Sequence, residues 1–333
     1  MYEEQQLLSL GSDANMLRKG IDELFATVQN YATSERFKEL LYFTAHFKKY
    51  APYNAMLIHV QCPGARYVLP PRWWLKYNRI IKTDSRPIVI LQPFSPVAYV
   101  YDVSDTIVIP GKEDKFDKRL ATPYVGDPDK KVDEGIFHKL CDQLRYWGIH
   151  YGLMRTGSNY AGKIEIGHDS DPLLDFSDDK KCPSQWRSAY TIKTSMSSGI
   201  TAQFNTIVHE LGHFFCRHIR SMYDKDWQNG IRSIPHEAKE FEAETVAWLV
   251  CRRLGVDNPS YRYLAHYFNK NGMIPQEVSI DEILKATRLV EQILYGVRME
   301  DAFLYKYCAA FRRAVEKIKE QRKKEREYLP LFS

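Results

Sequence analysis

Hydrophobic residues recur at intervals of three and four along much of the chain, which is the spacing of one face of an α-helix. This spacing predicts a helix that begins at Ser12 or Asp13, a second that begins at Thr33 or Ser34, and a short third over residues 54–61. Further along, it predicts helices near 133–147, 202–218 and 236–254, followed by helical structure as far as residue 327.

Two pairs of segments have instead the β-branched and aromatic composition of strands: residues 86–93 with 97–103, and residues 160–167 with 188–194. The segment between the pairs, residues 111–135, is charged, rich in Asp, Gly and Pro, and poor in large apolar residues, which indicates a linker. We therefore expect an α+β fold with two domains, namely a small module over residues 1–112, a linker over 113–133 and a larger domain over 134–333.

Composition narrows the class of protein. The 333 residues are 44% hydrophobic and 27% charged, which is typical of a folded globular protein, and the net charge of +5 leaves any nucleic-acid role to local patches. No apolar run approaches the length of a membrane span, and the acidic start MYEEQQLLSL lacks the basic region of a secretory signal. The six cysteines are scattered, without a CxxC pair, so we expect reduced thiols in a cytoplasmic protein with no membrane contact.

The most specific chemical signal is the segment TIVHELGHFF at residues 206–215. Its His209 and His213 are one helical turn apart, so both imidazoles reach the same point in space. Neutral imidazoles bind zinc and similar divalent ions, and Glu210 is placed to take a proton from a water that such an ion activates. Apolar neighbours indicate a buried helix, and Gly212 allows another backbone to come close. The sequence therefore predicts a metal centre of the zincin type.

A catalytic zinc site needs a third protein ligand and one open position. On a continuing helix His218 points about 140° away from His213, which makes it a poor ligand. The next predicted helix carries Glu240 and Glu244 on one face, and together they offer a metal ligand and a carboxylate that orients a ligand histidine. Glu242 lies on the opposite face of that helix and is expected to meet solvent.

The segment EFEAETVA, which starts at Glu240, makes this part of the chain resemble the ImmA/IrrE-type metallopeptidases. Their pattern is HExxH followed by ExxA(N/E)x(F/V)A. The resemblance implies that His209, His213 and Glu240 bind the metal, that Glu210 is the general base, and that Glu244 takes the place of the family's second Asn or Glu. Zinc is the expected ion, although two histidines and a carboxylate also accept Mn²⁺, Fe²⁺ or Co²⁺.

Zincins place an edge strand before the motif helix, and the segment 188–194 fits that place. The resemblance implies that a peptide substrate pairs with this edge. Tyr190 in the same segment is a candidate donor to the transition state, with a structural role as the alternative.

Residues 50–106 resemble the N-terminal domain of ArdC-type antirestriction proteins. The matching features are Tyr53-Asn54, Leu57-Ile58, Gln61, Pro63, Trp74 and the run YDVSDT at 101–106. The family's Lys-Gly before its third strand is replaced here by Asp84-Ser85-Arg86, so the turn differs. The resemblance implies a domain that binds single-stranded DNA, joined to an HExxH domain.

Residues 64–86 interleave basic and aromatic side chains, and that combination holds unpaired strands by charge neutralisation and base stacking. The candidate DNA contacts are Arg66, Arg72, Trp73, Lys76, Tyr77, Arg79 and Lys82. The alternative is an ordinary solvated basic face around a small core, and for Trp74 we expect a core position.

A basic run, Arg322, Lys323, Lys324 and Arg326, precedes the final YLPLFS. LPLF resembles the short peptides that dock into bacterial sliding clamps, with Tyr328 where such motifs usually begin with Gln. The alternative is a basic solvated helix whose apolar end packs back on the core.

These features predict a DNA-associated zinc endopeptidase that binds single-stranded DNA and hydrolyses a protein substrate. By resemblance, its setting is antirestriction or protection of mobile-element DNA. Two alternatives stay open: a non-catalytic antirestriction protein that binds single-stranded DNA and holds a structural metal, and a regulatory protease that cleaves a repressor.

Overall fold

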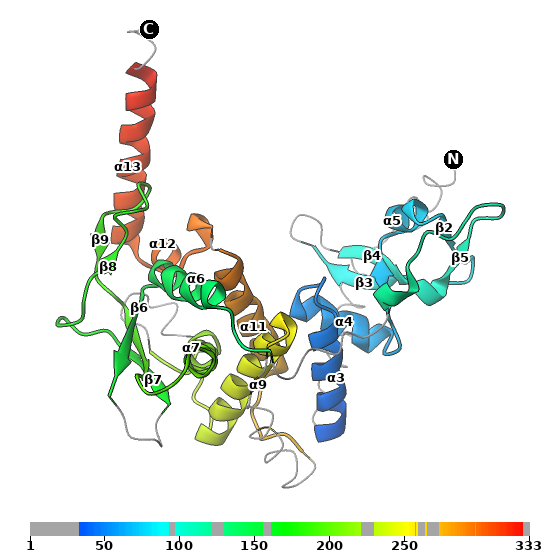
Figure 1. Ribbon diagram of the computed structural model, residues 1–333, viewed down its shortest axis with the longest axis horizontal. Helices are drawn as coiled ribbons and strands as arrows, with labels where there is room; N and C mark the ends of the chain where they lie inside the picture. The colour runs from blue at the N-terminus through cyan, green and yellow to red at the C-terminus, as the bar shows by residue number, and fades with distance from the viewer. Residues whose placement is uncertain are drawn as a thin grey trace. The chain divides into compact units, whose positions relative to one another are not determined.

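The computed structural model describes residues 33–92, 97–121, 130–155, 161–220, 230–256, 258, 264, 273–296 and 298–328 (Figure 1). The chain divides into two compact units, which we call the first unit (1–125 with 270–274) and the second unit (126–269 with 275–333). Both combine helices with small sheets, so the fold is α+β as expected. The helix predicted from Ser12 or Asp13 and the LPLF segment lie outside the described residues. No described helix is both long and apolar enough to cross a membrane.

The first unit packs two helices against a three-stranded antiparallel sheet of order β1-β4-β3. Its elements are α3 (Ser34–His46), α4 (Pro52–Gln61), β1 (Val68–Leu69), α5 (Pro71–Lys76), β2 (Arg79–Ile81), β3 (Ile88–Leu91), β4 (Val97–Asp102), η2 (Val103–Asp105), β5 (Thr106–Val108) and η3 (Lys118–Ala121). β2 and β5 form a separate antiparallel pair. Ile58, Val68, Ile88, Ile90 and Val100 form the core between α4 and the sheet.

Two amides on α4 hold the outer edge of β3. Asn54 donates to the carbonyl of Leu91 and accepts from its N–H, both at 3.0 Å, and Gln61 makes the same pair of bonds with Val89 at 2.8 and 2.9 Å. An edge strand leaves one row of backbone groups unpaired, and these side chains satisfy part of that row. These bonds hold α4 to the edge of the sheet.

The segment expected as a linker begins later than predicted. Phe116 is 6% exposed and packs in one aromatic cluster with Tyr67 and Trp74, and Asp114 forms a 2.6 Å salt bridge with Arg79. Residues 113–121 therefore belong to the first unit, because a single large aromatic residue in a charged stretch is enough to anchor that stretch to a core.

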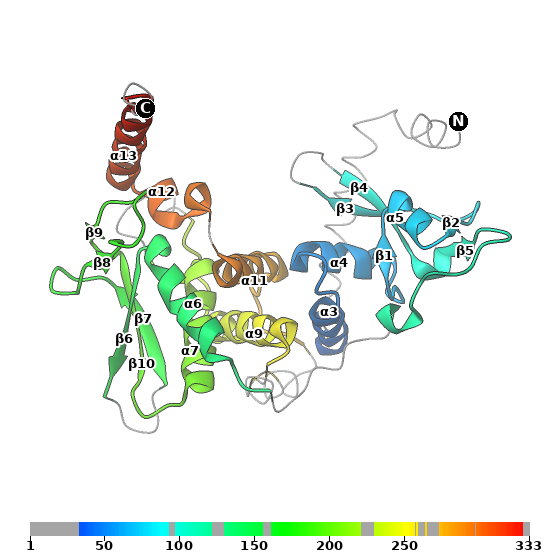
Figure 2. The same ribbon diagram turned by 45° about the horizontal axis from the view of Figure 1, so that its top comes forward.

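The second unit is built on a three-stranded sheet of order β6-β10-β7 with helices packed on it. Its elements are α6 (Glu134–Leu144), η4 (Arg145–Trp147), β6 (Ile149–Met154), β7 (Gly162–Ile166), β8 (Leu174–Asp175), β9 (Gln185–Trp186), β10 (Tyr190–Ser195), α7 (Ile200–Phe215), α9 (His236–Leu254), α11 (Ile280–Tyr295), η5 (Met299–Asp301), α12 (Phe303–Tyr307) and α13 (Ala309–Tyr328). α7 lies beside β7, and α9 and α11 pack against α7 (Figure 2).

The strand before the motif helix is not an edge strand, which corrects the prediction. β10 lies at the centre of its sheet, parallel to β6 and antiparallel to β7. The sequence of β10 agrees with this position, since five of its six residues are buried and a strand covered on both sides needs apolar or small side chains throughout. The two described edges are β6 and β7.

Candidate metal centre

The motif helix α7 carries two histidines that converge. α7 buries Phe204, Ile207, Leu211 and Phe214 in the core. His209 and His213 are only partly buried, at the margin of that core. The two Nε2 atoms are 3.1 Å apart. The i, i+4 spacing therefore brings both rings to one point, as expected from the sequence.

α9 supplies the third group. Oε1 of Glu240 lies 3.3 Å from Nε2 of His213, and Oε2 lies 3.5 Å from Nε2 of His209. The close approach of the two helices depends on Gly212, where an added Cβ would lie 2.8 Å from the Cα of Ala243. A glycine facing an alanine thus lets α9 come near enough for Glu240 to reach both imidazoles.

These three groups fit a divalent metal ion. Their donor atoms all lie within 4.8 Å of one another. Bonds of about 2.0–2.1 Å at tetrahedral angles place neighbouring donors about 3.3 Å apart. The two Nε2 atoms are close to that spacing at 3.1 Å, and each lies 3.3–3.5 Å from one of the two oxygens of Glu240. Two neutral imidazoles and a carboxylate form a three-ligand catalytic set, which leaves a fourth position for water or substrate.

The titration of these groups also favours a cation. Burial opposes protonation of His209, but its hydrogen bonds with Glu240 and Glu244 raise the pKa of His209 to about 10. Although burial raises it, the pKa of Glu240 is held well below its usual range by the hydrogen bonds with His209 and His213. The site therefore attracts positive charge, which a divalent ion can supply in place of a proton.

Glu210 lies beside these three groups. Its side chain is only 8% exposed, and burial raises the pKa of Glu210 above its ordinary value, while the neighbouring His209 lowers it in part. The N–H of Ile164 on β7 donates to Oε2 of Glu210 at 2.9 Å. This bond fixes the carboxylate between the motif helix and an edge of the sheet.

Glu244 lies behind His209, one turn after Glu240. Its Oε1 is 3.7 Å from Nδ1 of His209, the ring nitrogen that faces away from His213 and Glu240. Its Oε2 is buried with no hydrogen-bond partner among the described residues. The carboxylate is thus positioned to orient the ring of His209, in the role that the sequence indicates.

His213 has an orienting partner that sequence reasoning missed. α7 ends at Phe215, and Arg217 adopts the left-handed conformation with φ 61°, so the chain turns back. Nδ1 of His218 then lies 3.0 Å from Nδ1 of His213. The expected angle of about 140° between His213 and His218 holds only for a helix that continues past residue 215. This helix ends at Phe215, so the expectation was wrong.

Glu242 completes this arrangement and is not at the surface, which corrects the prediction. It is 0% exposed, and its oxygens meet Nε2 of His218 at 3.0 Å, the guanidinium of Arg232 at 2.5 and 2.9 Å, and the N–H of Ser279 at 2.7 Å. Burial raises the pKa of Glu242, but His218 and Arg232 outweigh this effect and keep it low. The far face of α9 packs against other parts of the unit, which no helical wheel reveals.

Cys216, His218 and Glu242 also bring three potential donor atoms together. The guanidinium of Arg232 already occupies both oxygens of Glu242, and a second cation beside it would be repelled. We therefore interpret this cluster as a hydrogen-bonded support for His213.

Tyr190 is a core residue, which corrects its assignment as a candidate catalytic donor. It is 0% exposed, packs edge-on against Phe214 and Phe303, and donates from its hydroxyl to the carbonyl of Arg220 at 3.0 Å. A buried tyrosine needs such a partner for its hydroxyl, and this bond uses the proton that a transition state would require.

The predicted DNA contacts fall into two groups. Arg66, Arg72, Trp73, Lys76 and Lys82 are exposed, and Nζ of Lys76 lies 3.9 Å from the centre of the Trp73 ring. The prediction for Arg79 is wrong, since its side chain is only 13% exposed and binds Asp114 and Thr106.

Tyr77 is half-buried in the same aromatic cluster as Trp74. Trp74 itself is in the core, as expected, and donates from Nε1 to the carbonyl of Tyr101. The residues of this segment that are free to contact a strand are thus fewer than predicted.

No protein-family model and no curated protein sequence matches the chain. Two solved structures are similar to it, both of the antirestriction protein ArdC from the R388 plasmid. The Mn(II)-bound form has 11% sequence identity and a TM-score of 0.30, over 74% of this chain and 89% of ArdC. The metal-free form has 12% identity and a TM-score of 0.29, over 73% of this chain and 84% of ArdC.

Proposed function

We propose that the protein is a divalent-metal-dependent peptide hydrolase, with His209, His213 and Glu240 as metal ligands and Glu210 as general base. The observation that carries this proposal is the convergence of the three donor groups from α7 and α9, with a buried carboxylate directly beside them. Zinc fits the donor set, and Mn²⁺, Fe²⁺ and Co²⁺ fit it as well.

An ion held by these residues would supply Lewis acidity, lowering the pKa of a water and polarising a carbonyl group. Glu210 then accepts the proton of the attacking water and delivers it to the leaving amine. Its raised pKa suits both steps, because a base that must also act as an acid works best with a pKa near the operating pH.

The substrate would bind along β7 instead of β10. β7 pairs only with β10 among the described strands, and its residue Ile164 already contacts Glu210. An extended peptide that adds to this edge would place its backbone next to the base. A protein substrate is therefore expected to present an unfolded or looped segment.

The first unit would bring the hydrolase to single-stranded DNA. The support is the exposed group on α5, where Trp73 is 41% exposed and lies between the exposed Arg72 and Lys76. An exposed ring flanked by cations is suited to stack on an unpaired base. A role in antirestriction, by hydrolysing or blocking a protein that acts on incoming DNA, is the setting that we propose.

Replacing Glu210 by Gln tests the hydrolase. Metal binding should survive, since Glu210 is not a ligand, while peptide hydrolysis should fall about 100-fold or more because the base is lost. The measurements are bound metal by elemental analysis and cleavage of a pool of unstructured protein substrates. If the Glu210→Gln variant kept its full antirestriction function, this would instead support a non-catalytic protein whose metal is structural.

A further inference from the structure

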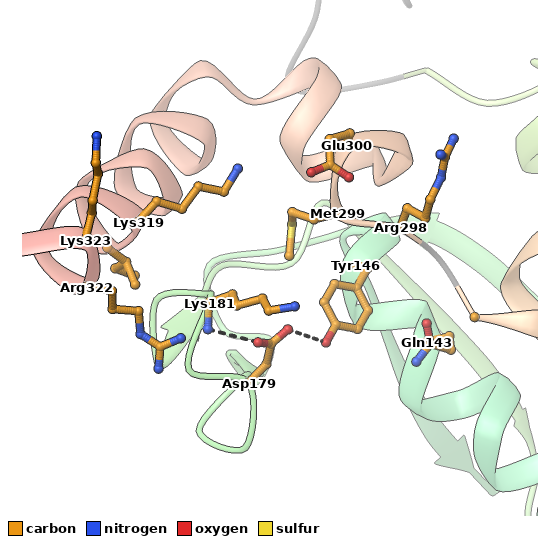
Figure 3. Close-up of a pocket in the computed structure, with 12 residues that line it drawn as sticks. Gln143, Tyr146, Asp179, Lys181, Arg298, Met299, Glu300, Lys319, Arg322 and Lys323 are labelled. Carbon is orange, nitrogen blue, oxygen red and sulfur yellow. Dashed lines mark hydrogen bonds between the residues drawn. The ribbon is translucent and has the colours of Figure 1, made fainter. Parts of the chain in front are cut away.

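A basic pocket in the second unit lies outside the metal centre. It has a volume of about 660 Å³, within the range of ordinary ligand sites. Its walls come from α13, from η5, from the loop after β8, and from the end of α6 with η4 (Figure 3). Five basic and two acidic side chains line it.

The floor of the pocket is a packed hydrophobic cluster. Phe176, Phe311 and Val315 are fully buried beneath it, and Tyr146 and Met299 pack against this cluster. The loop is held by Asp179, which accepts from the hydroxyl of Tyr146 at 2.7 Å and from the N–H of Lys181 at 2.9 Å (Figure 3).

The pocket carries positive charge that the protein does not neutralise. Arg298 pairs with Asp301 and Lys319 pairs with Glu316, but within the described residues the side chains of Lys181, Arg322 and Lys323 form no salt bridge. The two acidic side chains of the lining, Asp179 and Glu300, are outnumbered by the five basic ones. An anion is the ligand that this imbalance favours.

The sequence of α13 shows how the cations come to face the pocket. Phe311 and Val315 mark the buried stripe of the helix, and one turn later the same stripe continues with Lys319, Arg322 and Lys323. Lys319 and Lys323 are four residues apart, a like-charge pair that disfavours the helix unless an anion lies between them. Figure 3 shows Lys319 extending from α13 and Lys181 extending from the loop that carries Asp179.

We infer that this pocket binds a segment of single-stranded nucleic acid. Its phosphates would lie among Lys181, Arg322 and Lys323, and a base would pack against the wall formed by Tyr146 and Met299. A basic groove with an aromatic wall is the arrangement that holds unpaired strands without reading their sequence. This contact is separate from the metal centre and from the α5 surface of the first unit.

A pair of charge-matched variants tests the inference in the full chain. The pocket variant is Lys319→Gln with Arg322→Gln and Lys323→Gln. The control variant is Arg313→Gln with Lys317→Gln and Lys324→Gln, which removes the same number of lysines and arginines from exposed positions on another face of α13. Gln is a good helix former, so both variants should keep the helix, and circular dichroism checks this.

Binding is measured by fluorescence anisotropy with an oligo-dT of about 12 nucleotides, a length within the usual site size. The pocket variant should lose tenfold or more in affinity. The slope of log affinity against log salt should also fall by about 2 in magnitude, since three basic side chains no longer contact the phosphates of the strand. The control variant should lose less than twofold. The single variants Lys181→Gln and Arg322→Gln should each weaken binding, which keeps the test valid if the triple variant unfolds.

Equal losses in the two triple variants would overturn the inference, because they would show only a general charge effect. Competition by poly-aspartate as effective as that by the oligonucleotide would also overturn it, in favour of an acidic protein partner. The same measurements in a Trp73→Ala background separate this site from the first unit.

Discussion

At the scale of single residues, both histidines of the proposed metal site have a neighbour that fixes the orientation of the ring. His209 has Glu244 on its far nitrogen, and His213 has His218, which is held by the buried Glu242. Such partners set the tautomer and the direction of a ligand ring, so they govern how strongly the metal binds.

Replacing His218 by Ala should weaken metal binding by about 10- to 100-fold, because His213 loses its orienting partner and Glu242 loses one of its bonds. The measurement is competition for Zn²⁺ with a coloured chelator. His236→Ala is the matched control. The His236 side chain is 86% exposed and its Nδ1 lies 3.6 Å from Oε1 of Glu240, but we assign His236 no role in metal binding. Equal losses in both variants would contradict the assignment of His218.

The pKa of His209 predicts opposite pH trends with and without metal. Protonated His209 stabilises the metal-free fold fully below pH 6.5, the ordinary pKa, and this contribution is lost as the pH rises through about 10. Metal binding needs the neutral ring, so the apparent affinity rises over the same window. The difference in melting temperature between zinc-loaded and EDTA-treated protein should therefore grow from pH 6.5 upward, and a constant difference would argue against His209 as a ligand.

At the scale of elements, the site depends on the contact between α7 and α9. Gly212 and Ala243 set how closely the helices approach, and this distance decides whether Glu240 reaches the imidazoles. The same contact buries the middle of both helices, so packing and metal geometry are linked.

Gly212→Ala should therefore lower both stability and metal affinity. Alanine gains up to about 1 kcal/mol in helix propensity, but overpacking a tight core contact costs about 1–3 kcal/mol. We expect a net loss in the free energy of unfolding, measured by urea denaturation of the metal-free protein, together with weaker zinc binding. Gly152→Ala, where an added Cβ meets only ordinary contacts, is the control. A more stable Gly212→Ala variant with unchanged affinity would refute this account of the helix contact.

At the scale of the whole molecule, the two activities that we propose, hydrolysis and strand binding, lie in different units. The metal centre lies within the second unit, and the exposed α5 group lies within the first. The resemblance that points to DNA includes residues whose role in this structure is to hold β3, namely Asn54 and Gln61. The contact with single-stranded DNA that we propose must therefore come from other, exposed side chains.

Two variants of the first unit separate these roles. Trp73→Ala should weaken binding of single-stranded DNA by about 1–3 kcal/mol of stacking energy with little change in melting temperature. Asn54→Ala leaves the N–H and C=O of Leu91 without their partner, so it should destabilise the fold by about 1–3 kcal/mol instead. Fluorescence anisotropy measures strand binding, and thermal unfolding measures stability. If Trp73→Ala lowered only stability and Asn54→Ala lowered only strand binding, Trp73 would not be the contact with the strand.

Much of the local structure follows from the sequence alone. The i, i+4 pair in HELGH, the adjacent base and the carboxylates one turn apart on the next helix depend on helical periodicity, which the chain carries within a few residues. The core position of Trp74 and the close approach at Gly212 follow in the same way from residue size. These are short-range properties, so the sequence determines them.

The tertiary structure decided what depends on contacts between distant segments. It placed β10 at the centre of its sheet and Tyr190 in the core, turned the chain back after Phe215 so that His218 meets His213, and buried Glu242 beside Arg232. None of these follows from periodicity, because a strand's neighbours and a helix's second face are set by packing partners far away in the chain. The support of His213 by His218 and Glu242 belongs to this class, whereas the two histidines and the pair Glu240 and Glu244 follow from the sequence.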